Sequence, residues 1–208
     1  MSEILTNKIT PVTGTTVTLG DSGDTFNIPS GANITNSGTA TGFGGGKILQ
    51  IISTHDTTAR SQTGTDGGKT VLTGLAASIT PSATSSKILI SARWNGENGT
   101  VGRTHDAVLG IQRGGTNIGE PSSAGNRKLG IAQVLSNPYQ ADNADSTLEG
   151  AMFEYLDSPS STSSLTYNIT YQTSDGAYTI YTNRSATDAD GVHVERLTSS
   201  ITLWEIGV

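Results

Sequence analysis

Bulky apolar residues recur every eight or nine positions along the first 45 residues of the chain. They are Ile9, Val17, Phe26, Ile34 and Phe43. Thr, Ser, Asn, Pro and Gly fill the intervals, and nothing follows the helical period of an amphipathic segment. One bulky side chain per short strand-and-turn unit cannot form a core within one chain, whereas several copies wrapped about a shared axis can bury it. The pattern therefore predicts an intertwined, oligomeric β-shaft over 1–45 with these residues as its core.

The segments that follow the glycine run at 44–46 are longer and more apolar. The clearest of them alternates, with Ile88, Ile90, Ala92 and Trp94 on one face, as a strand with one buried face does. The predicted strands are 47–55, 70–80, 87–95, 106–113, 128–135, 148–157, 164–173, 177–184 and 199–207. The segment 148–157 also suits a short helix.

Two dipeptides between predicted strands are typical of tight hairpins. They are Gly114 with Gly115, and Asp175 with Gly176, which lies between two Tyr-rich segments. About nine short strands in one unit favour a β-sandwich, most simply a jelly roll. The sequence thus predicts an all-β chain with a shaft over 1–45 and a jelly-roll-like β-sandwich head over 46–208.

Composition and charge narrow the possible partners. The net charge is −6 and only 12 residues are basic, which argues against a nucleic-acid partner. No apolar run is long enough to predict membrane insertion. The absence of cysteine excludes disulfides and thiolate-held metals. The first five residues lack the basic leader and apolar region of a secretory signal, so we expect the chain to fold in a cytoplasm.

Short blocks occur along the chain in a recognisable order. They are 6–11, 18–26, 29–32, 45–50, 80–82, 85–89, 156–159, 180–181 and 183–184. In this order they resemble the shaft and head of tail-fibre-like virion proteins of marine bacteriophages, including phages of cyanobacteria. The blocks span most of the chain and contain no catalytic signature.

The resemblance implies a homotrimer with a β-structured head, carried on the virion and used for attachment to the host. The sequence pattern alone also allows two or four copies. Longer fibres of this kind have a separate anchoring domain before the shaft, and this sequence shows none. We therefore expect residues 1–12 to dock on other virion proteins, either on the tail or on the capsid.

Metal binding and catalysis find little support in the sequence. His193 and Glu195 would lie on one face of a strand, and 188–191 resembles the start of a calcium loop, but each lacks the remaining ligands. We expect no metal and no cofactor. Glycan hydrolysis needs two carboxylates across a cleft. The candidates, all in or beside predicted loops, are Glu97, Asp106, Glu120, Asp142, Asp145 and Glu149.

Receptor binding is better supported, because long loops on a rigid β-scaffold commonly carry recognition. Tyr139 lies on the polar loop 136–146, and Arg103 and His105 lie on the loop 96–105, beside its segment 97–102. Tyrosine is also a frequent anchor of protein interfaces. These three are the predicted receptor-binding residues.

We expect several other aromatic and basic residues to stabilise the structure rather than bind a receptor. The aromatic residues that fit alternating strands, and are therefore expected in the core, are Trp94, Trp204, Tyr167 and Tyr171. Arg184 and Arg196 are candidates for ion pairs with acidic neighbours across subunits, which the sequence does not decide.

The sequence as a whole predicts a non-enzymatic, homotrimeric virion fibre that binds a host surface glycan or protein. Three alternatives remain open at this stage. They are a capsid-decorating head fibre without an essential receptor, a small glycan depolymerase, and an oligomeric lectin unrelated to a virus.

Overall fold

The computed structural model describes residues 9–33, 35, 37–38, 47–99, 107–123, 125–134, 147–173 and 177–207. The chain divides into two units, Met1–Phe43 and Gly44–Val208, and each is described by itself. Among the described residues there is no helix, and every strand pairing is antiparallel. The predicted all-β class is confirmed.

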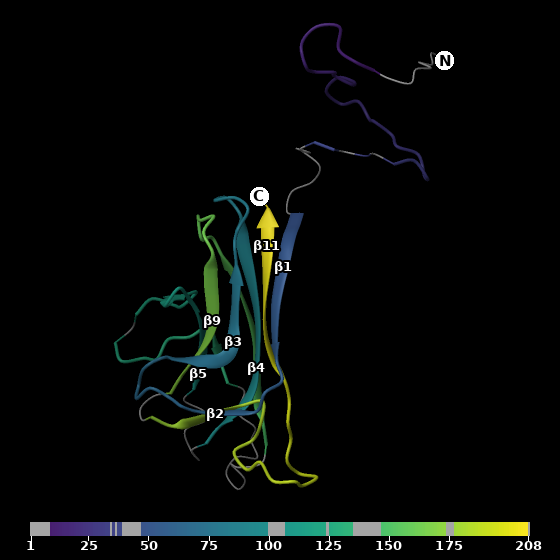
Figure 1. Cartoon of the computed structure of the whole chain (residues 1–208). Coiled ribbons are helices and arrows are strands. Elements are labelled where there is room, and N and C mark those ends of the chain that lie inside the picture. Colours follow the sequence, from purple (N-terminus) through teal and green to yellow (C-terminus); the bar gives the residue numbers. More distant parts are fainter. Residues whose placement is uncertain are drawn as a thin grey trace. The chain divides into compact units, whose positions relative to one another are not determined.

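Six strands of the second unit form one sheet around β4, the longest strand (Figure 1). They are β1 (Lys47–Asp56), β11 (Ser199–Gly207), β4 (Lys87–Asn98), β10 (Thr179–Thr182), β2 (Arg60–Thr63) and β8 (Glu149–Asp157). β11 and β10 pair in succession along one edge of β4, and β8 pairs along the other edge. β1 lies outside β11, and β2 lies outside β10.

The remaining five strands form the second sheet. They are β3 (Thr70–Ile79), β5 (Val108–Arg113), β6 (Thr116–Ile118), β7 (Ala132–Gln133) and β9 (Leu165–Gln172). β9 lies between β3 and β5, and β6 and β7 both pair with β5. One of the two sheets is strongly curled, like half of a barrel.

A single hydrophobic core is formed by the inward side chains of both sheets, because alternate residues of each strand point to the same face. On β4 the buried hydrophobic residues are Ile88, Ile90, Ala92 and Trp94, as the alternation predicts. Other buried members are Leu72, Leu75, Ala77, Ile79, Leu109, Ile111, Phe153, Tyr167, Ile169, Tyr171, Ile201 and Leu203.

Most strand predictions are confirmed, and the exceptions have physical reasons. The segment 149–157 is a strand rather than a helix, because Ala151 and Phe153 alternate into the core. β2 was not predicted, since its four residues are polar. β7 covers only two residues of the predicted 128–135.

Of the two predicted hairpins, one is confirmed and one is wrong. β5 and β6 pair across Gly114 and Gly115, whose φ values of 55° and 85° require the left-handed region that glycine tolerates. The strands around 174–176, by contrast, belong to different sheets. β9 pairs with β3 and β5, whereas β10 pairs with β2 and β4. Asp175 and Gly176 themselves lie outside the described residues, and the chain passes from the second sheet to the first between β9 and β10.

The first unit exposes the apolar residues that its spacing singles out. Ile9, Val17 and Phe26 are 58%, 41% and 67% exposed in the single chain. Ile34 and Phe43 lie outside the described residues. The described part of this unit contains turns but no strand, including a turn closed by a bond from Asp24 N to Asp21 O at 3.1 Å.

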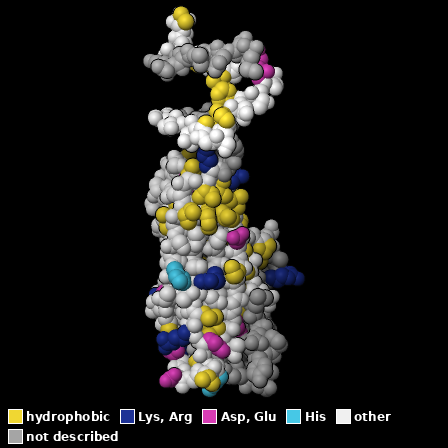
Figure 2. Space-filling view, turned by 90° about the vertical axis from the view of Figure 1, so that its right-hand side faces the viewer, with side chains coloured by type: hydrophobic (Ala, Val, Ile, Leu, Met, Phe, Trp, Pro, Cys, Tyr) yellow, Lys and Arg dark blue, Asp and Glu magenta, His cyan; other side chains and the backbone are white. Residues whose placement is uncertain are grey.

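The outer face of the first sheet carries a row of apolar side chains across four strands. Ile51 of β1 lies opposite Trp204 of β11. Trp204 lies opposite Leu89 of β4, which lies opposite Leu156 of β8. We call these four residues the apolar row. Figure 2 looks onto this face and shows hydrophobic side chains gathered near the end where β1 begins.

The prediction that Trp204 belongs to the core is wrong. Its neighbours on β11, Leu203 and Glu205, are fully buried and point inward. Trp204 therefore points outward and is only partly buried. Trp94, Tyr167 and Tyr171 do lie in the core, as predicted.

Candidate binding surface and buried polar groups

The three predicted receptor-binding residues, Arg103, His105 and Tyr139, lie outside the described residues. The same holds for three of the candidate carboxylates, which are Asp106, Asp142 and Asp145. The described residues instead form a polar groove on the second sheet, whose lining includes one of the candidate carboxylates, Glu120.

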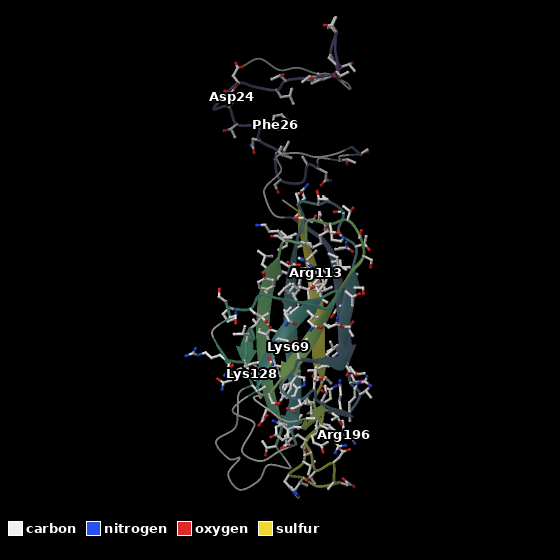
Figure 3. The ribbon with its side chains drawn as sticks, turned by 90° about the vertical axis from the view of Figure 1, so that its left-hand side faces the viewer. Asp24, Phe26, Lys69, Arg113, Lys128 and Arg196 are labelled. Atoms are coloured by element: carbon white, nitrogen blue, oxygen red, sulfur yellow. The ribbon has the colours of Figure 1, made fainter. Side chains whose placement is uncertain are left out.

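The polar groove has a volume of about 800 Å³ and is lined almost entirely by polar side chains. It is lined by Lys69, Gln112, Asn117, Glu120, Gly125, Asn126, Arg127, Lys128, Leu129 and Gln172. Gln112 and Gln172 come from β5 and β9, at positions where strand alternation turns a side chain toward solvent. Figure 3 labels Lys69 and Lys128, which come from segments 59 residues apart in sequence.

Hydrogen bonds from side chains hold the walls of the polar groove in place. Lys69 Nζ forms an ion pair with the Glu120 carboxylate and donates to the carbonyl oxygen of Leu129. Lys128 Nζ and Gln172 Nε2 both donate to the carbonyl oxygen of Gly67, at 3.1 and 2.6 Å. The bonds of Leu129 and Lys128 tie the segment 125–129 to residues 67–69, and the bond from Gln172 ties Gly67 to β9.

The charge of the polar groove is opposite to that of the chain. Three cationic side chains, Lys69, Arg127 and Lys128, line it with one carboxylate, Glu120, whereas the whole chain has a net charge of −6. Its described lining includes no aromatic ring, so recognition there depends on hydrogen bonds and charge rather than on stacking. Such a surface suits a polar, anionic ligand.

Two candidate carboxylates, Glu97 and Glu149, lie near one another but are buried. They are 1% and 3% exposed, and neither lines the polar groove. Glu149 lies opposite Gly96, so it shares the inward face of the sheet, and Glu97 as the next residue points to the other face. Glu97 accepts a bond from Ala186 N at 2.6 Å. This arrangement does not offer a sugar two accessible carboxylates across a cleft.

Three inward polar side chains at this end of the core lack hydrogen bonds of standard geometry. They belong to Glu149, Asn98 and Tyr171, and all three side chains are buried. Burial, together with repulsion from the Glu97 charge, raises the pKa of Glu149 to about 8. The backbone N–H of Asn98 lies close enough to offset part of this shift.

The segment 188–191, predicted to be a turn or the start of a calcium loop, has its first carboxylate occupied by arginine. Arg196 donates to both Asp188 oxygens, at 2.9 and 2.6 Å, and Arg184 Nη1 lies 3.6 Å from Oδ2. The bond from Arg196 lowers the pKa of Asp188. Both arginines therefore pair within the chain. His193 lies in a turn rather than on a strand.

No protein-family model matches the chain, and no curated protein is significantly similar to it in sequence. In the described part of the chain, no group of three or more His, Cys, Asp or Glu side chains is placed to hold a metal ion. The same residues include no helix long and apolar enough to cross a membrane.

Proposed function

We propose that the chain is a structural and adhesive virion fibre protein of a bacteriophage. It assembles as a homotrimer, with a shared β-shaft formed by the first unit and a jelly-roll-like β-sandwich head formed by the second. Residues near the N-terminus join it to other virion proteins, and the head binds a host surface glycan or protein. The order of the sequence blocks supports the virion assignment, and two structural features support the assembly and the adhesion.

The observation that carries the proposal is the exposure of the regularly spaced apolar residues in the first unit. Ile9, Val17 and Phe26 are between 41% and 67% exposed. Burial of one such side chain contributes about 1.5–3 kcal/mol. The gain repeats along the unit and is multiplied by the number of copies. Association of several copies thus removes an exposure that a single chain cannot avoid.

The polar groove supports the adhesive role. Its amide and carboxylate side chains can hydrogen-bond the hydroxyl groups of a surface polysaccharide. Its cationic side chains suit the carboxylate or sulfate groups that such a polysaccharide carries. Three heads on one fibre bind one surface simultaneously, so individually weak sites give firm attachment.

The solution mass of the full chain tests the assembly. We expect a mass about three times 21.5 kDa by light scattering. Because the apolar residues of the first unit drive association, Phe26→Asp lowers this mass, while Thr25→Asp at the neighbouring position does not. A monomeric full chain contradicts the fibre proposal.

Binding of the full chain to an array of acidic and neutral polysaccharides tests the adhesive role. We expect retention on acidic polysaccharides, and Asn126→Trp abolishes it because the indole fills the groove. Val192→Trp adds the same side chain at a fully exposed loop position and leaves binding intact. A trimer without glycan or host-cell binding favours the capsid-decorating alternative. Release of reducing sugar favours a depolymerase.

A further inference from the structure

We infer that the apolar row is the surface through which copies of this chain meet in the Gly44–Val208 unit. The inference rests on the proposed function, because its partners are the other copies of the fibre. It assigns a second assembly surface, on the first sheet, in addition to the first unit.

The surroundings of the apolar row extend it into a continuous apolar surface. Ile51 and Leu156 are 50% and 45% exposed, and the nearby residues Ile48 and Leu49 of β1 are 58% and 46% exposed. Trp204 lies at the centre of this surface, between Ile51 and Leu89. Soluble monomers rarely expose large contiguous apolar patches, and such patches mark sites of association.

The orientation of Trp204 favours a protein partner over a sugar. Its Nε1 is buried and has no hydrogen-bond partner, so the exposed part of the indole is apolar. An exposed tryptophan that binds sugar needs neighbouring groups that bond to the hydroxyls. The cross-strand neighbours of Trp204 are Ile51 and Leu89, which offer none. An apolar protein surface is the partner that this arrangement suits.

The covalent connection between the two units indicates that the protein partner is another copy of the same chain. Three residues, 44–46, separate the end of the first unit from Lys47, where β1 begins. Phe43 and Lys47 are therefore at most about 15 Å apart, four steps of about 3.8 Å each. Copies that share a shaft formed by the first unit, which ends at Phe43, hold the beginnings of their β1 strands near one another. Ile51 lies only four residues into β1, so the apolar rows of the same copies are within reach of one another.

Thiol labelling of single-cysteine variants tests this surface, since the chain has no cysteine of its own. Ile51→Cys places a thiol in the apolar row. Val71→Cys, on β3, places one at a β-branched position that is 40% exposed on the other sheet. In the assembled full chain we expect the Ile51→Cys thiol to react with a maleimide at least about ten-fold more slowly than the Val71→Cys thiol. In denaturant the two rates become equal.

A charge within the row gives the second measurement. Leu89→Asp buries an unpaired carboxylate at the contact and raises the dissociation constant of the assembly by a factor of about 100 or more. Met152→Asp, on the same outer face but outside the row, leaves the solution mass unchanged.

The outcomes separate this inference from the proposed function. Slow labelling at Ile51→Cys, or loss of assembly in that variant but not in Val71→Cys, supports the inference. Equal, fast labelling of both thiols in a protein of trimer mass overturns it and leaves the shaft assembly standing. A monomeric wild-type chain overturns both.

Discussion

The two ends of the core in the Gly44–Val208 unit carry buried carboxylates that differ in their hydrogen-bond partners. At one end, Glu205 of β11 and Asp157 of β8 lie on either side of Ile88 of β4, on the inward face. At the other end, Glu149 lies opposite Gly96 on the same face. All three carboxylates are nearly inaccessible to solvent.

Hydrogen bonds distinguish the ends. Glu205 Oε1 accepts bonds from the backbone N and the Oγ of Ser82, both at 2.6 Å, and Oε2 accepts one from Gln50 at 2.6 Å. Burial alone raises the pKa of a carboxyl, but these bonds outweigh it and lower the pKa of Glu205 to about 2. Glu149 has burial and repulsion from Glu97, with only the backbone N–H of Asn98 to offset them, and its pKa rises to about 8.

The comparison shows that burial does not determine the state of a carboxylate; its partners do. Asp157, at the same end as Glu205, has partners from the other sheet. Arg113 Nη1 lies 2.6 Å from its Oδ2, and Tyr167 donates its hydroxyl to the same atom at 2.7 Å. Because Arg113 and Tyr167 come from the second sheet, this satisfied end also links the two sheets. The other end keeps its unpaired polar groups at a cost in stability, as functional sites often do.

The largest expected effect is a pH-dependent gain in the free energy of unfolding from Glu149→Gln. The pKa of Glu149 rises from 4.5 to about 8 on folding, so the folded state holds a proton that the unfolded state releases. Wild-type stability therefore falls as pH rises from 4.5 to 8, by roughly 5 kcal/mol from this group. Gln stays neutral and removes that loss. Urea unfolding at pH 5 and pH 9 should show near-equal stability at pH 5 and a more stable variant at pH 9.

The control for this prediction is Glu154→Gln, two strand positions beyond Met152 on the exposed face of β8. It removes the same charge at an exposed position, so it separates the effect of charge removal from the effect of the buried carboxyl. Parallel curves for wild type and Glu149→Gln would show that Glu149 is ionised in the folded protein.

At the opposite end of the core, the stability that Glu205 contributes is expected to depend on pH with the opposite sign. The pKa of Glu205 falls from 4.5 to about 2 on folding, so its contribution is complete above pH 4.5 and is lost as pH falls toward 2. Glu205→Gln removes the charge that Ser82 and Gln50 stabilise, and lowers the free energy of unfolding at pH 7 by about 2–3 kcal/mol. The same unfolding measurements at pH 7 and pH 3 check it. A variant as stable as wild type at pH 7 contradicts this account.

The sequence predicted the strands better than it predicted the hydrogen-bond partners that set the pKa values of the buried carboxylates. Alternation along 87–95 and 164–173 placed Ile88 and Tyr167 inward, because each strand carries its own pattern. The partners of a buried carboxylate follow from strand register, which no local pattern encodes. Ser82 reaches Glu205 across 123 positions of sequence. The failed hairpin at Asp175 and Gly176 has the same origin, since local turn residues do not reveal a crossing between sheets.

The candidate surfaces show the same limit. Gln112 and Gln172 of the polar groove could be placed on solvent-facing strand positions, but their meeting with Lys128 depends on the packing of the segment 125–129. The sequence did not predict the apolar row, for a related reason. Alternation assigns Trp204 to one of two faces, and composition alone favours the buried one, so the outer face was identified only from the burial of Leu203 and Glu205.

The smallest expected effects come from a matched pair of tyrosines on β9. Tyr167 and Tyr171 lie two alternating positions apart, and both are fully buried. Tyr167→Phe removes the hydroxyl that bonds Asp157 at 2.7 Å, and should cost about 1–1.5 kcal/mol. Tyr171→Phe removes a buried hydroxyl that has no partner among the described residues, and should be neutral or stabilising by up to about 1 kcal/mol.

Each substitution deletes one hydroxyl oxygen from an equally buried tyrosine ring. A difference in lost packing therefore cannot explain a difference in stability between the two variants. Urea midpoints at pH 7, with unchanged dependence on denaturant, report the difference directly. A destabilised Tyr171→Phe would mean that its hydroxyl has a partner in the folded protein, and that the end of the core around Glu149 is satisfied after all. Equal midpoints for the two variants would mean that the bond to Asp157 adds nothing to what Arg113 already supplies.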